Sequence, residues 1–341
     1  MNLYDIKLEA LTDTLVTGKI SDQEYFSEKY SAYVSNSRLG NINPKQDGSP
    51  EKFFNKMENI YSDSLILGSA VHTKVLQSEL FELIQIERPN AKLGFVCDYI
   101  WDNSPEHILS MDIIEKASEK IGYYKNSLND KKIDAIKIAY DAYYKSRSKY
   151  KPKEGIEPMF LSPKLYEIAT GCINACVNNN NFTSIMHPLC LLEDPISENE
   201  QAFLMDFKCE FPNRNPIIIK LKSKLDNYTI DFENNTITVN DLKTIGAILP
   251  KFDGREGNFG RFHYSRELSL YLFLLKHYAA KKYGMIDPQM KVNCLVVSTI
   301  SDYYTKVYEV SNRELQEGFN EFKQLMRLVA YYIAYKGYEL N

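Results

Sequence analysis

The order of strand-like and helical segments in the C-terminal half most limits how this chain can fold. A helical run, 264–284, and a final helix, 311–337, follow the 3.6-residue period of apolar positions. The first helix lies between the third and fourth of five segments with strand composition, which are 199–211, 216–226, 236–245, 291–300 and 305–310. A helix that connects two strands crosses over their sheet, so this order predicts a mixed sheet with helices packed on it.

The region before these strands is predicted to be mostly helical. Residues 2–30 are predicted as two short helices, with further helices at 62–82, within 109–150 and at 162–179. We therefore expect an α/β (α+β) protein, in which a mixed central sheet is flanked by helices. The helical region is expected over 1–197 and the sheet over 198–341, with the helical region packed onto the sheet to form one integrated domain.

Composition and charge fit a soluble protein of 341 residues. Hydrophobic residues make up 44% and charged residues 25% of the chain, as in ordinary globular domains. The net charge of -4 argues mildly against a nucleic-acid binder, although a local basic groove can accompany an acidic metal site. No stretch approaches the roughly 20 apolar residues of a membrane span, and the N-terminus lacks a signal-peptide core. We expect a cytoplasmic protein without membrane contact.

The six cysteines are scattered, which is typical of a reducing, intracellular compartment. Cys172 and Cys176 are four residues apart and could share a helix face, but two sulfurs make only half of a metal site. The favoured interpretation is that they are small buried hydrophobic residues.

Two neighbouring predicted strands carry charges that a core strand does not need. Asp226 ends one strand, and Asp241 and Lys243 lie two residues apart, hence on one face, of the next. A turn centred on Glu233–Asn234 sets Asp226 opposite Asp241, whereas one centred on Asn234–Asn235 sets it opposite Lys243. Either register brings the two carboxylates close together.

Facing carboxylates repel each other unless a cation neutralises them. Mg²⁺ prefers a few carboxylates with waters and phosphate oxygens, and Mn²⁺ is a possible substitute. A lysine beside such a metal can orient a water nucleophile or stabilise charge on a phosphate, so these groups suit phosphodiester hydrolysis. The tripeptide Asp-x-Lys occurs four times and means little alone, and a surface hairpin with solvated charges stays open.

A histidine on the helix predicted at 62–82 adds a second candidate ligand. Gly68 and His72 are four residues apart and therefore share a helix face. Neutral imidazole can ligate a metal, although a capped or half-buried histidine is the alternative.

These blocks resemble a known family. "LGSAVHTKVLQSELF", "KSKLD", "TITVNDLKTI" and "FHYSRELSLYLFLLKHYAAKKYG", in this order, look like the RecE-type exonucleases (exodeoxyribonuclease VIII-like) of the PD-(D/E)xK nuclease superfamily. The resemblance covers about 33–82 and 198–335 and leaves 83–197 as an unmatched insertion. It implies a restriction-endonuclease-like core with a helical N-terminal half.

The resemblance also implies an activity and partners. It indicates a Mg²⁺-dependent deoxyribonuclease that acts on duplex DNA ends in phage or prophage recombination or replication, in a bacterial host cytoplasm. A ring-shaped homo-oligomer and a single-strand annealing protein as partner are typical of such enzymes. A catalytically weak or inactive nucleic-acid-binding protein and a structure-specific endonuclease remain alternatives. Relatives with an iron–sulfur cluster carry four cysteines, and only Cys294 occurs late here, so no cluster is expected.

Site residues follow from the same resemblance. His72, Asp226 and Asp241 would be metal ligands, and Lys243 would be the catalytic lysine. A family motif of Gln followed four residues later by Tyr falls on two further catalytic candidates, Glu267 and Tyr271, so that Glu replaces the usual Gln. Glu200 falls at a weaker upstream acidic position of the family.

Basic residues near the hairpin are candidates for nucleic-acid contact. Lys222 and Lys224, with Lys220, alternate on one strand and face the same way. A Gly-rich loop after the second strand carries Lys251, Arg255 and Arg261, which could follow phosphates. Aromatic residues interleave with them and would suit base stacking, namely Phe252, Phe259, Phe262 and Tyr264. A solvated, flexible loop is the alternative.

Overall fold

The computed structural model describes residues 2–55, 61–123, 128–186, 195–254, 256–300 and 302–340. The chain divides into two compact units. The sheet unit comprises Met1–Glu58, Asn178–Val297 and Tyr304–Asn341, and the helical unit comprises Asn59–Val177 and Ser298–Tyr303. The first 58 residues therefore belong with the C-terminal sheet, whereas the sequence grouped them with the helical region.

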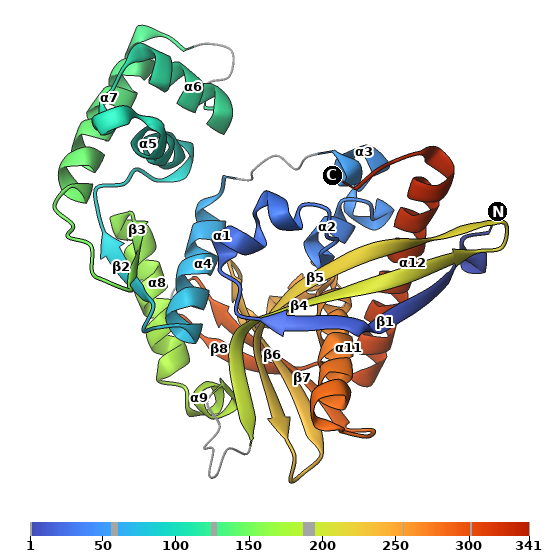
Figure 1. Cartoon of the computed structure of the whole chain (residues 1–341). Helices are drawn as coiled ribbons and strands as arrows, with labels where there is room; N and C mark the ends of the chain where they lie inside the picture. Colours follow the sequence, from blue (N-terminus) through green and yellow to red (C-terminus); the bar gives the residue numbers. More distant parts are fainter. Residues whose placement is uncertain are drawn as a thin grey trace. The chain divides into compact units, whose positions relative to one another are not determined.

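The sheet unit is built on a six-stranded sheet of order β1-β4-β5-β6-β7-β8 (Figure 1). Antiparallel pairing joins β1 to β4, β4 to β5, β5 to β6 and β7 to β8. The strands are β1 (Lys7–Gly18), β4 (Ile196–Phe211), β5 (Arg214–Asp231), β6 (Thr236–Ile245), β7 (Gln289–Ser298) and β8 (Thr305–Glu309). The mixed α/β architecture with a mostly antiparallel central sheet agrees with the class expected from the sequence.

Two long helices, α11 and α12, pack against each other and on this sheet (Figure 1). Ser311 and Glu314 form a capping box at the start of α12, and Gly284 ends α11 in a left-handed conformation with φ 68°. The α-helices of this unit are α1 (Asp22–Tyr25), α2 (Asn36–Gly40), α3 (Pro50–Phe54), α9 (Asn180–Met186), α10 (Asn258–Arg261), α11 (Tyr264–Tyr283) and α12 (Asn312–Lys336). Short 3-10 turns cover η1 (Leu3–Asp5), η2 (Glu28–Tyr30), η3 (Pro44–Gln46) and η5 (Leu249–Lys251).

The prediction of two helices over residues 2–30 is wrong. The strand β1 occupies Lys7–Gly18 of this stretch and pairs with β4 from Lys7↔Glu210 to Gly18↔Ala202, and only the four residues of α1, Asp22–Tyr25, form an α-helix. The threonines and valine of β1 favour a strand, and its paired residues on β4 lie between 184 (Gly18 to Ala202) and 203 (Lys7 to Glu210) positions further along the chain. The charged, amphipathic pattern of the N-terminus therefore reflects an outer strand of the sheet.

The helical unit has its own apolar core and a small parallel sheet. The core gathers residues of α5, α6 and α7, including Val96, Ile114 and Tyr143. β2 pairs with β3 in parallel from Phe81↔Glu157 to Gln85↔Leu161. The elements are α4 (Asp63–Leu76), β2 (Phe81–Gln85), α5 (Ala91–Asn103), η4 (Pro105–His107), α6 (Met111–Ile121), α7 (Asp130–Arg147), β3 (Glu157–Leu161) and α8 (Pro163–Val177).

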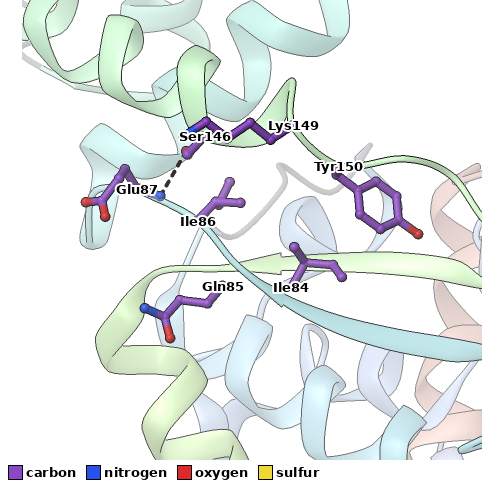
Figure 2. Close-up of a pocket in the computed structure, with 7 residues that line it drawn as sticks. All are labelled: Ile84, Gln85, Ile86, Glu87, Ser146, Lys149 and Tyr150. Carbon is purple, nitrogen blue, oxygen red and sulfur yellow. Dashed lines mark hydrogen bonds between the residues drawn. The ribbon is translucent and has the colours of Figure 1, made fainter.

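A cavity of about 360 Å³ lies in the helical unit beside the end of β2. Figure 2 shows its lining, where the backbone N–H of Glu87 donates a hydrogen bond to the Ser146 hydroxyl at 3.0 Å. The remaining lining residues are Ile84, Gln85, Ile86, Lys149 and Tyr150. None of these residues is a candidate site residue from the sequence.

Cys172 and Cys176 are buried with free thiols on α8, as the favoured interpretation expected. Cys190 lies outside the described residues. Among the helices of the described ranges, none is long and apolar enough to cross a membrane.

Candidate metal centre

The β5–β6 hairpin uses the register that sets two aspartates side by side. Its paired positions run from Asp231↔Thr236 to Asn227↔Asn240, which centres the turn on Glu233–Asn234. Asp226 and Asp241 are the next residues along the two strands and therefore face each other. The Leu242 backbone N–H donates a hydrogen bond to Asp226 Oδ2 at 2.8 Å, which fixes that carboxylate beside β6.

A third carboxylate continues the row onto β4. Asn199 pairs with Asn227 and Gln201 with Leu225, so Glu200 lies opposite Asp226. Glu200 has φ 55°, a left-handed backbone conformation that is unusual inside a strand. Glu200 and Asp226 each present a carboxylate oxygen within 4.8 Å of the other. We call Glu200, Asp226 and Asp241 the acidic row.

Lys243 lies between the acidic row and helix α11. Its ammonium is 2.8 Å from Asp241 Oδ2 and 3.1 Å from Glu267 Oε2. The Tyr271 hydroxyl donates a hydrogen bond to Glu267 Oε1 at 3.0 Å, and the Tyr264 ring lies 4.8 Å from the ammonium. The structure therefore brings Asp241, Lys243, Glu267 and Tyr271 together.

Asp241 is the least satisfied polar group of this centre. Its side chain is buried, and neither carboxylate oxygen has a hydrogen-bond donor among the described residues. The Lys243 ammonium lies 2.8 Å from Oδ2 as its ion-pair partner. Buried carboxylates normally accept hydrogen bonds or ligate a cation, so this geometry fits a metal ligand. Carboxylate oxygens are the donors that Mg²⁺ and Mn²⁺ prefer.

Burial and the charges of neighbouring carboxylates raise the pKa values of two members of the acidic row, Asp226 and Asp241. Burial, with the nearby Glu200 and Glu267 charges, raises the pKa of Asp226 to about 7 against the lowering effect of Lys243. Burial and the carboxylates of Asp226 and Glu267 likewise raise the pKa of Asp241 to about 8. Without a cation, this pair thus holds protons near neutral pH, and a metal that binds there must displace them.

The pKa values of Glu267 and Lys243 shift in the directions that favour their charged forms, in contrast to those of Asp226 and Asp241. Burial by itself raises the pKa of Glu267, but the Lys243 charge and the hydrogen bonds from Lys243 and Tyr271 lower it below its usual value. Burial by itself disfavours the Lys243 ammonium, yet the carboxylates of Asp241, Glu267 and Asp226 raise its pKa well above the usual value. Lys243 and Glu267 are therefore a charged pair across the pH range in which Asp226 and Asp241 titrate.

The raised pKa of Asp241 predicts a pH-dependent stability of the metal-free protein. The folded-state pKa of about 8 exceeds the unfolded value of about 4, so the folded state binds more protons between these limits. Stability in EDTA should fall as the pH rises through this window. Asp241→Asn should weaken this fall and raise the melting temperature most at alkaline pH. Thermal melts of both proteins check this, and parallel melting curves across the window would refute it.

Lys222 and Lys224 have internal partners. Lys222 is 7% exposed, and its ammonium donates a hydrogen bond to the Tyr25 carbonyl at 2.7 Å, while burial lowers its pKa to about 8. Lys224 forms ion pairs with Asp22 at 2.6 Å and Glu200 at 2.7 Å. As predicted, both lysines face the same way, but they face the N-terminal segment of this unit. This placement does not favour a phosphate contact for Lys222, because its amine is buried.

The loop after β6 divides into buried and exposed parts. Lys251 and Arg261 are exposed, and Arg255 lies outside the described residues. Phe252 and Phe259 are buried in the core of the sheet unit, so the prediction that they stack on bases is wrong. Phe262 is 50% exposed beside Arg261 and stays available for such a contact.

His72 lies on α4 in the helical unit, one turn after Gly68. Its assignment as a metal ligand stays a prediction from the resemblance.

Sequence reasoning missed two members of this centre. Cys294 on β7 is fully buried, and its pKa is raised by burial and by the charge of Asp241, so a protonated thiol borders the row. Tyr25 is buried, and its pKa is raised by burial and then by the charges of Glu267 and Asp22, so its hydroxyl lies near Glu267. Tyr25 belongs to a segment without a strand or metal signal, so only the folded chain reveals it.

Comparison with known proteins finds a weak likeness among solved structures. No family model and no curated protein matches the sequence. The fold is similar to the crystal structure of a candidate exonuclease from Eubacterium rectale, with a TM-score of 0.46 and 13% sequence identity. The match covers 92% of this chain and 86% of that chain.

Proposed function

We propose that this protein is a metal-dependent DNA nuclease with a PD-(D/E)xK core, acting as an exonuclease on duplex ends. The observation that supports this best is Asp241, a buried carboxylate without a hydrogen-bond donor among the described residues, beside Asp226 and Lys243. Carboxylates in such a place need a cation, and a lysine that touches them suits hydrolysis of a phosphodiester.

The residues of the acidic row fit Mg²⁺, with Mn²⁺ as a substitute. Glu200, Asp226 and Asp241 would hold the ion through carboxylate oxygens. Cys294 is a poor ligand for such a hard cation, because its sulfur is a soft donor. His72 is proposed as a further ligand on the basis of the family resemblance. When bound, the ion supplies Lewis-acid polarisation of the phosphate and a more acidic water.

Lys243 orients the water nucleophile and stabilises the negative charge that develops on the phosphate. Its ion pair with Glu267 holds the ammonium beside Asp241 and keeps it protonated. A protonated amine that is already positioned stabilises negative charge on a phosphate without reorganisation in the reaction. Glu267, where the family usually has Gln, thus acts as a positioning residue for Lys243, and Tyr271 in turn positions Glu267.

The biological setting is proposed from the resemblance alone. It comprises a phage-type role in recombination or replication, a ring-shaped oligomer and an annealing protein as partner. Lys251, Arg255 and Arg261 would follow the DNA backbone.

One cleavage assay tests the proposed activity. Purified protein is incubated with end-labelled linear duplex and with closed circular DNA, in Mg²⁺ and in EDTA. Loss of the linear DNA alone, and only with metal, is the expected result. Cutting of the circle would replace the exonuclease by a structure-specific endonuclease. If neither DNA is cleaved, the alternative of a non-catalytic nucleic-acid-binding protein with this fold would replace the nuclease.

The loop cations predict a change in salt dependence. Lys251→Ala and Arg261→Ala should each reduce the slope of log K against log salt by about 0.7 to 0.9, because each removes about one phosphate contact. Fluorescence anisotropy with a short duplex measures the slope. Lys336→Ala, at the exposed end of α12, is the matched control and should leave the slope unchanged. Equal slopes in all four proteins would show that Lys251 and Arg261 do not contact the DNA phosphates.

A further inference from the structure

Four asparagines on four neighbouring strands are linked by their side chains. Asn227 on β5 donates through Nδ2 to Asn199 Oδ1 on β4 at 2.7 Å. Asn240 on β6 donates to Asn227 Oδ1 at 2.7 Å, and Asn293 on β7 donates to Asn240 Oδ1 at 2.9 Å. These three hydrogen bonds form a continuous chain across β4, β5, β6 and β7, which we call the asparagine ladder.

The ladder is a buried network. Asn227 is 0% and Asn240 is 1% exposed. Asn227 also donates to Ser197 Oγ at 3.1 Å and to the Met186 carbonyl at 3.3 Å. Buried amides are tolerated only with hydrogen-bond partners, and a satisfied buried network favours one arrangement of its strands over others.

The ladder lies directly behind the acidic row. Successive side chains of a strand point to opposite faces of the sheet, so neighbours in sequence lie back to back. The neighbouring positions are Asn199 and Glu200, Asn227 and Asp226, Asn240 and Asp241, and Asn293 and Cys294. Both rows therefore cross the same strands at the same level.

The acidic row needs such support. Its carboxylates repel one another across adjacent strands, and Glu200 lies in a strained left-handed conformation. A shift of one residue between two strands would move every carboxylate of the shifted strand to the other face. The hydrogen bonds of the ladder form only in the native register, because each one needs two asparagines at the same level of neighbouring strands. A shift of one residue would separate them.

We propose that the asparagine ladder is a positioning device that fixes the register of β4 to β7 at the acidic row. It thereby holds Glu200, Asp226 and Asp241 at the separation that a divalent cation requires. The consequence for metal binding rests on the proposed function, whereas the consequence for the register does not.

Metal affinity separates this role from a general contribution to stability. Asn240→Ala removes two hydrogen bonds of the ladder, and Asn293→Ala removes one from a strand that carries no carboxylate ligand. Both variants should weaken Mn²⁺ binding, by on the order of 10-fold for Asn240→Ala, because carboxylates that are no longer held at the right separation bind the ion less tightly. Ile237→Ala on β6, also fully buried, is the matched control.

The measurement is Mn²⁺ titration calorimetry at a temperature where melts show all variants folded. The control should lose melting temperature but keep the wild-type Kd. The Asn227→Ala/Asn240→Ala double variant should bind no more weakly than the worse single variant, since both break one unit. Wild-type affinity in Asn240→Ala, or an equal loss in Ile237→Ala, would overturn the proposal.

A metal-free readout keeps the proposal separate from the nuclease assignment. The Leu242 amide is protected by its hydrogen bond to Asp226, so its hydrogen exchange in EDTA reports the register at the row. Exchange should quicken about 10-fold or more in Asn293→Ala and clearly less in Ile237→Ala. If the wild-type protein binds no Mn²⁺, the metal assignment fails. The exchange rates of the Leu242 amide in the two variants still test whether the ladder fixes the register. Equal exchange in both variants would refute the ladder's role.

Discussion

Replacing Asp241 with asparagine is expected to lower Mg²⁺-dependent cleavage of linear duplex DNA by on the order of 10³-fold or more. The change keeps the size of the side chain but removes the buried charge that has no hydrogen-bond donor among the described residues. Lewis-acid stabilisation of a phosphoryl transition state is worth several kcal/mol, and a factor of ten in rate corresponds to about 1.4 kcal/mol. Single-turnover cleavage of an end-labelled duplex measures the loss.

Asp206→Asn is the matched control for this prediction. Asp206 also begins an Asp-x-Lys tripeptide on a strand, β4, but lies outside the acidic row. This variant should cleave at the wild-type rate. If Asp241→Asn retained that rate too, the acidic row would not be the catalytic centre.

Replacing Lys243 with methionine is expected to have the second largest effect, a loss of about 10² to 10³-fold in the cleavage rate. One preorganised donor at a developing negative charge is typically worth this much. In contrast to Asp241→Asn, this variant should bind Mn²⁺ at least as tightly as wild type. The reason is that Asp241 and Glu267 lose their shared cation and attract a metal more strongly.

The two readouts for Lys243→Met are single-turnover cleavage and Mn²⁺ titration of the same preparation. Lys208→Met, in the Asp-x-Lys tripeptide of β4, is the control, because Lys208 pairs with Glu9 and Glu210 at the surface. A wild-type rate in Lys243→Met would remove the lysine from catalysis. A parallel loss of metal binding and rate would instead make it a structural residue.

Local patterns predicted much of the sheet and the hairpin. β6 has the predicted bounds, 236–245, because the segment is rich in the β-branched residues Thr, Val and Ile. The two-residue period of a strand placed Asp241 and Lys243 on one face, and the Asn-rich turn limited the hairpin to two registers, one of which is found. These features depend on residues close in sequence, so a sequence alone is enough to predict them.

Features that depend on distant partners escaped prediction. β1 forms a strand because it pairs with β4, and no local signal reports that pairing. Lys224 looked free until the fold brought Asp22 and Glu200 to it. Phe252 looked exposed in a Gly-rich loop, but the loop folds back and buries its ring.

One signal for the site was present in the sequence and was not used. Glu200, Asp226 and Asp241 each have an asparagine as direct neighbour. Because neighbours in a strand face opposite sides, three acid–asparagine pairs on paired strands predict an asparagine row behind an acidic row. The hydrogen bonds within that row still required the structure.

The central claim is that the acidic row binds a divalent cation, and a crystal soaked in MnCl₂ tests it most directly. We expect an anomalous peak within about 2.5 Å of carboxylate oxygens from Asp226 and Asp241, as for a hard cation with oxygen ligands. The peak should disappear in Asp241→Asn crystals. A fully soaked wild-type crystal with no manganese at either aspartate would contradict the account.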